Sequence, residues 1–195
     1  NLYGDDNEVD INGTYSFKKE ISPNDFDNTC DIKNFAIYSI EEFIAQYIDN
    51  TQGTVSGQLA LKGPRNQPDL LGYLDINDVT TTVTYLQTTY NIKNERVLFE
   101  KNQINLGNKL KVTDIEGNIA YGKGRVYHSH LKDFGLDIEV QSSKVMGLNT
   151  TIEDNQDFYG KAYIKGGVTF KGLTNDITIN VFGESEGKSE LSIPL

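Results

Sequence analysis

Tryptophan is absent from the 195-residue chain, and cysteine occurs only once, at Cys30. A single cysteine cannot form an internal disulfide, so no disulfide framework holds the fold. The lack of tryptophan argues against a platform that stacks sugar rings. No apolar run reaches the ~18 residues that a membrane-spanning helix needs. These absences exclude a disulfide scaffold and predict no transmembrane helix.

Cations are scarce as well. The chain has 18 Lys and Arg residues against 28 Asp and Glu residues, for a net charge of −10. Nucleic-acid binding needs a basic stripe that releases counterions from phosphates, and the sequence has none. An anionic membrane surface would repel a chain of this net charge. We therefore exclude a nucleic-acid partner.

The two ends indicate a piece of a longer protein. The chain starts without Met or a signal-peptide pattern, and residues 190–195 read ELSIPL, like an interrupted strand. We expect any export signal or membrane anchor to lie outside this sequence.

Apolar and polar residues alternate through most of the chain. Leu136 and Ile138, for example, alternate with Asp137 and Glu139. Such a period of two predicts strands with one apolar and one hydrated face. Turn-forming sequences separate about a dozen such runs: Asn12-Gly13, Gly63-Pro64, Glu116-Gly117, Gly122-Lys123-Gly124 and Gly166-Gly167. The sequence therefore predicts a mainly β protein.

On each of these strands, every second residue is consistently apolar. We expect these apolar residues to line a groove. A register slip of one residue would move the whole set to the opposite face. The predicted lining residues are Leu59, Leu61, Leu74, Ile119, Leu136, Ile138, Ile164 and Phe170.

A single segment has a helical pattern. Ser39 and Glu42 match an S-x-x-E capping box, and apolar residues then recur at helical spacing. The pattern predicts an amphipathic helix over residues 39–49 that ends at Asn50. A helix of about ten residues is too short to be stable alone. We therefore expect its apolar stripe to dock on the sheet and narrow one end of the groove, with Phe43, Ile44 and Tyr47 in contact.

Glycine recurs inside the predicted strands, where it is unfavourable unless the backbone must bend. The repetition indicates one curved sheet. Residues 53–76, G-x-V-x-G-x-L-x-L-x-G-x-x-x-x-P-x-L-x-G-x-L-x-I, resemble the C-terminal domain of the TamB family, which belongs to the AsmA-like proteins. Residues 83–92, 114–128 and 158–163 resemble the forms found in Bacteroidota members. The resemblance covers about residues 50–195, while residues 1–49, the N-terminal strands and the helix, fit only loosely.

The resemblance implies a long antiparallel or mixed sheet curled into a "β-taco" groove with an apolar interior. It implies a non-enzymatic role in the periplasm, in phospholipid transport to the outer membrane or in assembly of outer-membrane proteins. It also implies no cofactor, an inner-membrane anchor elsewhere in the protein, and work beside TamA or another barrel of the BamA superfamily.

The final strands are expected to contact that barrel, since exposed sheet edges recruit further strands. The residues expected at this edge are Ile177, Ile179, Val181, Leu191 and Ile193. The alternative is a secreted β-sandwich for adhesion or protein binding, whose apolar faces would close on each other.

Two motifs suggest chemistry without supporting it. Residues 183–187 match the G-x-S-x-G nucleophile elbow, but no helix or histidine can follow in the eight residues that remain. His128 and His130 could share a metal on one strand face, with Asp114 or Asp133 as a further ligand, yet nothing in their spacing requires it. We expect a turn at the first motif, two solvent-facing histidines at the second, and no metal.

Overall fold

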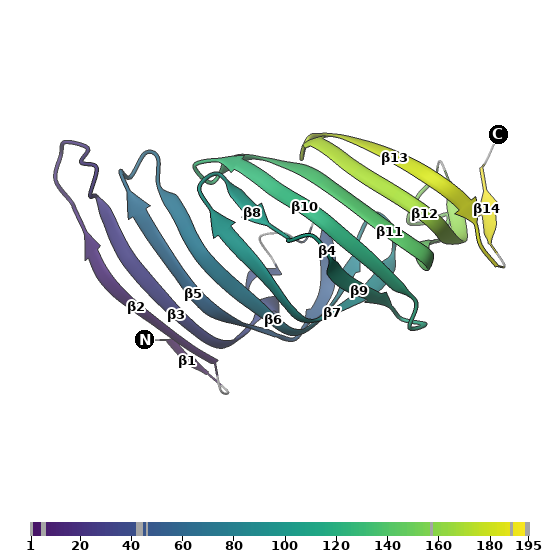
Figure 1. Cartoon of the computed structure of the whole chain (residues 1–195), viewed down its shortest axis with the longest axis horizontal. Coiled ribbons are helices and arrows are strands. Elements are labelled where there is room, and N and C mark those ends of the chain that lie inside the picture. The colour runs from purple at the N-terminus through teal and green to yellow at the C-terminus, as the bar shows by residue number, and fades with distance from the viewer. Residues whose placement is uncertain are drawn as a thin grey trace.

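The chain forms one large curled sheet in the computed structural model, which describes residues 2–4, 7–41, 45, 47–156, 158–187 and 189–193. Within these residues the sheet has fourteen strands, and the path through it runs β1-β2-β3-β5-β6-β7-β8-β10-β11-β12-β13. The strands lie side by side along the long axis, with the two termini at opposite ends (Figure 1). The predicted fold class, a curled and mainly antiparallel sheet, is confirmed.

The strands differ greatly in length. In chain order they are β1 (Leu2–Gly4), β2 (Asn7–Tyr15), β3 (Phe26–Ala36), β4 (Ile48–Gln52), β5 (Thr54–Gly63), β6 (Asp69–Val83), β7 (Thr88–Glu100), β8 (Gln103–Asn105), β9 (Leu110–Asp114), β10 (Ile119–Ser129), β11 (Lys132–Thr150), β12 (Tyr159–Leu173), β13 (Asp176–Ser185) and β14 (Glu190–Ser192). Three short strands branch from the main path: β4 pairs with β6, β9 with β7 and β10, and β14 with β12.

Glycines inside the strands permit the curl. Gly72 in β6 has φ +129°, and a Cβ built on it would overlap the carbonyl oxygen of Gln58 in β5. Gly124 and Gly166 are in the same situation. The turns predicted at Asn12-Gly13, Gly122–Gly124 and Gly166-Gly167 are therefore wrong, because these residues lie within β2, β10 and β12. Glycine at these sites serves close approach of neighbouring backbones.

The helical segment differs from its prediction at both ends. A 3-10 helix, η1 (Ile37–Ile40), has Ala36 as its N-cap, so Ser39 lies inside it. Strand β4 starts at Ile48, which pairs with Val83, so the helix cannot extend to Asn50. Phe43 and Ile44 lie outside the described residues, and Tyr47 is a 42% exposed turn residue.

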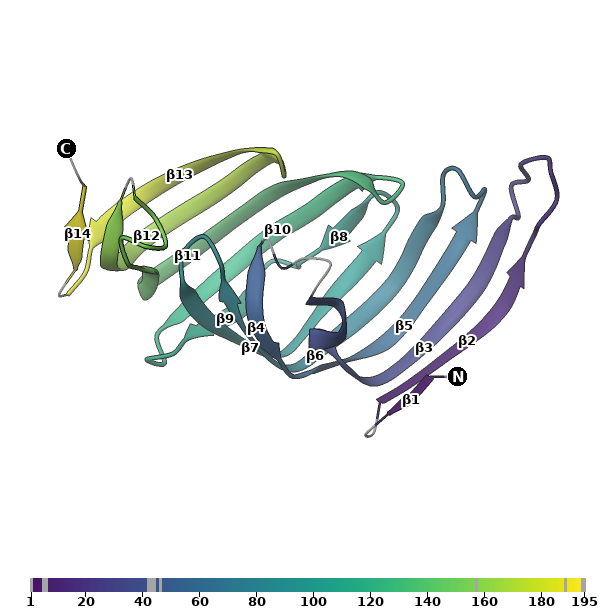
Figure 2. The same ribbon diagram turned by 180° about the vertical axis from the view of Figure 1, so that it is seen from behind.

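A cluster of buried residues lies where β7, β9 and β11 meet. The end of β11 runs past β10 and reaches the β6–β7 hairpin, where Asn149 N donates to Leu86 O at 2.9 Å. Met146 and Thr88 are each only 1% exposed there. The sheet thus folds toward itself at one set of strand ends, as seen from behind in Figure 2.

Candidate apolar binding face

A row of residues without a polar side chain crosses ten strands of the sheet. Residues directly opposite each other in an antiparallel pair project to the same side, so the pairing register traces the row from one strand to the next. The row consists of Ile11, Cys30, Leu59, Gly72, Phe99, Ile104, Val126, Leu136, Gly172 and Ile177. We call this set the apolar row, and the side of the sheet that carries it the apolar face.

Seven of the eight residues predicted to line the groove lie on the apolar face. Leu59 and Leu136 belong to the apolar row itself. Leu61 and Leu74 keep its parity on β5 and β6. The other three continue it on β11 and β12: Ile138 pairs with Phe170, and Ile164 pairs with Val145.

Ile119 is the exception and lies on the opposite side of the sheet. It pairs with Thr113 in β9, and Ala120 takes the apolar-face position next to it. Ile119 is 37% exposed, whereas Ala120 is 2% exposed. Strand β10 presents small residues such as Ala120 to the apolar face. The prediction chose Ile119 because it is larger, and this choice assigned the wrong side of β10 to the groove.

The apolar face is only partly shielded from water. The seven predicted residues that share it are all half-buried, and none of them belongs to the fully buried core. Side chains between two closed layers would be buried on both sides. This single sheet instead leaves apolar surface accessible.

The opposite face carries ion pairs between side chains of neighbouring strands. Arg96 Nε lies 2.6 Å from Asp75 Oδ1, and Lys123 Nζ lies 3.0 Å from Glu139 Oε2. The hydrogen bond from Arg96 holds the pKa of Asp75 below its ordinary value, and that from Lys123 does the same for the pKa of Glu139. These charged groups are partly exposed, so this polar face is the hydrated side of the sheet.

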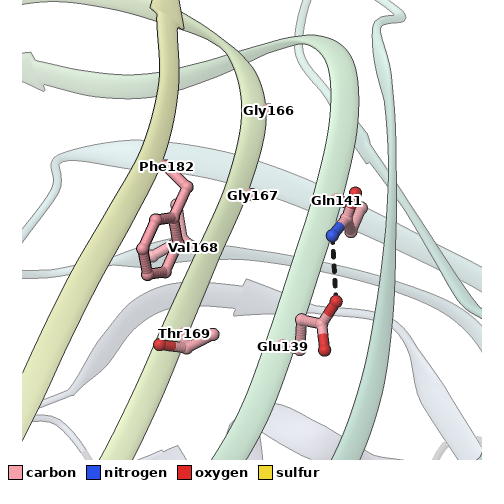
Figure 3. Close-up of a pocket in the computed structure, with 7 residues that line it drawn as sticks. All are labelled: Glu139, Gln141, Gly166, Gly167, Val168, Thr169 and Phe182. Atoms are coloured by element: carbon pink, nitrogen blue, oxygen red, sulfur yellow. Dashed lines mark hydrogen bonds between the residues drawn. The ribbon is translucent and has the colours of Figure 1, made fainter.

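A shallow pocket lies on the polar face near the C-terminal edge. Gly167 has no side chain, and this leaves space between Phe182 on β13 and Gln141 on β11 (Figure 3). Gln141 Nε2 donates to Glu139 Oε1 at 2.9 Å along one wall. Gly166, Val168 and Thr169 of β12 complete its lining.

Two carboxylates hold the β9–β10 turn in place. Buried Asp114 accepts bonds from the backbone N–H groups of Glu116, Asn118 and Met146. Burial acts to raise the pKa of Asp114, but the bonds from Asn118, Met146 and Glu116 outweigh it and leave the pKa lowered. Glu116 in turn accepts from Tyr163 Oη at 2.6 Å, and this bond is the main cause of the lowered pKa of Glu116.

The predicted partner-binding residues gather at one edge of the sheet. Strand β13 pairs with β12 over residues 164–173, and β14 pairs with β12 over residues 159–161. Ile177 is half-buried on the apolar face. The other four are exposed, from 44% to 66%: Ile179, Val181, Leu191 and Ile193.

The two histidines lie near the β10–β11 turn. His128 is 6% exposed, so the expectation that it faces solvent is wrong. Burial lowers its pKa, and its Nδ1 accepts from Leu131 N at 3.2 Å. Within the described ranges, no three His, Cys, Asp or Glu side chains are placed to share a metal ion. The turn expected at the G-x-S-x-G match is wrong for its first three residues, because residues 183–185 lie in β13.

Sequence reasoning missed part of the apolar row. Ile104 and Val126 complete it between β7 and β11, but neither was expected to line the groove. Strand β8, which carries Ile104, is only three residues long and is too short for alternation to reveal it. Cys30 also belongs to the row, and burial is the main cause of its raised pKa.

Comparison with known proteins finds a family match for the first half of the chain. A family model described as the TamB C-terminal domain matches residues 1–109. The match includes residues 1–49, which were expected to fit only loosely, together with residues 53–76 and 83–92, and it ends before residues 114–128 and 158–163. No curated protein and no solved structure matches the chain. In the part of the chain that the structure describes, no helix has the length and apolar character needed to cross a bilayer.

Proposed function

The chain belongs to the TamB C-terminal domain family, whose members serve envelope biogenesis as translocation and assembly modules, and from that premise we propose that its apolar face carries phospholipid acyl chains across the periplasm. The face would shield the chains from water while the headgroups remain hydrated. The protein needs no catalytic residue or cofactor to carry acyl chains in this way.

The observation that carries the proposal is the apolar row. It crosses ten strands without a polar side chain. Its two end members, Ile11 and Ile177, project to the same face of the sheet. Burial of one CH₂ group is worth about 0.8 kcal/mol, so a ten-carbon stretch gains roughly 8 kcal/mol before ordering costs. Aliphatic side chains do not fix the position of an acyl chain, so the chain can slide along them.

The charged face supports the same assignment. Its ion pairs keep the outer side of the sheet in water, which leaves the apolar face as the side that takes up apolar cargo. A second cargo, the apolar side of an unfolded outer-membrane strand, would use the same surface. The β-sandwich alternative does not fit this structure, because all fourteen described strands belong to one sheet.

We further propose that β13 and β14 contact an outer-membrane barrel of the BamA superfamily such as TamA. Strand β13 pairs only with β12 among the described strands, so one side of its backbone can accept another strand. Exposed Val181 and Ile193, at 58% and 66%, would pack against that partner.

A pair of matched variants tests the cargo proposal. Leu136→Asp places a charge in the apolar row, whereas Leu98→Asp places the same charge on the polar face, where Leu98 pairs with Tyr73. We expect both variants to fold, because each carboxylate can reach water. Leu136→Asp should lose binding of cis-parinaric acid, a fluorescent acyl-chain probe, and Leu98→Asp should keep it.

Two results would contradict the proposal. Unfolding of Leu136→Asp by circular dichroism would indicate a closed core, since an unpaired buried carboxylate is very costly. Equal probe binding by the two folded variants would show that the apolar face is not the binding surface.

A further inference from the structure

The loop between β2 and β3 exposes apolar side chains at the end of the sheet. It spans residues 16–25, and Phe17 within it is 89% exposed, the highest value among the large hydrophobic residues that the structure describes. Ile21 is 54% exposed. A loop that presents two such side chains to water leaves unfavourable apolar surface uncovered.

The exposure is fixed by the bonds that hold the loop. The Arg65 guanidinium donates to the carbonyls of Lys18 and Lys19 at 2.6 and 2.8 Å. Fully buried Asp25 accepts from Ser22 N at 3.1 Å and from Arg65 N at 3.3 Å. Arg65 lies in the neighbouring β5–β6 loop, so two loops support one shape. These hydrogen bonds therefore fix the loop conformation that exposes Phe17 to water.

Two lysines flank the exposed phenylalanine. Lys18 and Lys19 use their carbonyls to bind Arg65, and neither ammonium group takes part in an ion pair within the described part of the chain. Of the nearby acids, Asp25 is buried and Asp27 lies 3.2 Å from Lys62. Only Glu20 in the loop adds a negative charge without a described ion pair.

The loop that carries Phe17 lies at the strand ends opposite to several acidic turn residues. Because neighbouring strands are antiparallel, the β2–β3 and β5–β6 loops lie at the same strand ends (Figure 1). The acidic loops that contain Glu116, Glu153 and Asp154 lie at the opposite ends. The net charge of −10 thus does not describe the surface around Phe17.

We propose that this loop docks the domain on a phospholipid bilayer surface. Phe17 and Ile21 would enter the boundary between headgroups and acyl chains, where aromatic and aliphatic tips are favoured. Lys18 and Lys19 would extend to the lipid phosphates while their stems cover apolar surface. A fixed apolar tip flanked by free ammonium groups matches this chemistry better than it matches a wholly apolar protein pocket.

Docking would bring one end of the apolar face to the membrane. The ring of Phe17 lies 4.6 Å from that of Tyr15, which lies 5.0 Å from that of Phe26. Tyr15 and Phe26 pair with each other and keep the parity of the apolar face. The docking inference stands on the loop alone and does not require that the face carries lipid.

The test uses the absence of tryptophan from the chain. Phe17→Trp supplies a single fluorophore at the loop. Tyr85→Trp is the matched control, since Tyr85 is 57% exposed in the β6–β7 turn at the opposite strand ends. With vesicles of phosphatidylethanolamine and phosphatidylglycerol, we expect Phe17→Trp emission to shift to shorter wavelength and to resist iodide quenching. Tyr85→Trp emission should stay unchanged.

A charge variant completes the test. Adding Lys18→Glu and Lys19→Glu to Phe17→Trp should weaken partition to these vesicles by at least ~10-fold, with an unchanged circular dichroism spectrum. The proposal is overturned if natively folded Phe17→Trp gives no vesicle-dependent shift, including the case in which the loop binds only a protein. It is also overturned if both tryptophan variants shift equally. Retained cis-parinaric acid binding in such a result would leave the acyl-chain proposal standing.

Discussion

The hydroxyl of Tyr90 in β7 donates to the backbone carbonyl of Met146 in β11 at 2.7 Å, across 56 positions of sequence. The two strands are not neighbours in the strand order, because β8, β9 and β10 lie between them. Burial raises the pKa of Tyr90, so its hydroxyl remains a neutral donor at physiological pH. This bond joins two parts of the sheet that a flat arrangement would separate, and it therefore helps to set the curl.

Loss of this bond should loosen the sheet. Tyr90→Phe keeps the ring but removes the donor, so the free energy of unfolding should fall by about 1–2 kcal/mol. Urea denaturation measures the change. Tyr121→Phe, on the half-exposed polar side of β10, is the control and should change stability by less than ~0.5 kcal/mol. Equal effects in the two variants would mean that the Tyr90 bond does not hold the curl.

Asp114 should make part of the fold sensitive to acid. Its folded pKa lies below the ordinary value of 3.8, so its contribution to stability is complete above 3.8 and disappears as the pH falls through the folded pKa. Asp114→Asn should cost roughly 2 kcal/mol at neutral pH, since the bonds to the charged group weaken. The difference in unfolding free energy between the parent and this variant should shrink on acidification below 3.8. A difference that stays constant down to strong acid would contradict the role of the charged carboxylate.

Gly72 should be far less replaceable than a turn glycine. Both Gly72 and Gly117 have positive φ, at +129° and +84°, but only at Gly72 would a Cβ overlap backbone, since nothing lies within 4 Å at Gly117. Gly117→Ala should cost about 1 kcal/mol from backbone strain alone. Gly72→Ala should cost more than ~3 kcal/mol or prevent folding. Thermal unfolding of the two variants measures the contrast, and equal costs would show that close strand approach is not what requires Gly72.

Alternation predicted the sheet and most of its apolar side because a strand has a strict period of two. Leu136 and Ile138, or Ile164 and Phe170, therefore share a side whatever pairs with them. The pattern alone could not identify which parity of β10 faces that side, because Ala120 there is smaller than Ile119. The choice depends on pairing with β9 and β11, and pairing is a long-range property.

The sequence pattern also could not predict where a strand shifts register or where the helical segment ends. Strand β11 shifts register between Ser142 and Val145 and again between Met146 and Leu148, so its apolar parity changes twice. The helical spacing after Ser39 predicted a helix to residue 49, but Ile48 fits equally well on a strand, and its pairing with Val83 decides the outcome. Tertiary pairing overrides local spacing at both places.

The C-terminal edge should recruit the outer-membrane barrel by strand addition. Val181 in β13 is 58% exposed and lies on a strand that has only one partner among the described residues. Leu98 in β7 is 41% exposed but lies in the interior of the sheet, between β6 and β8. With a photo-crosslinking residue at either position, we expect position 181 to capture a barrel of the BamA superfamily in cells and position 98 to capture none. Capture only from Ile11, near the opposite edge, would reverse the orientation of the domain, since among the described strands β1 covers only residues 7–9 of that edge of β2. Capture from position 98 as readily as from 181 would show that the partner contacts a face of the sheet, and strand addition at the edge would then be wrong.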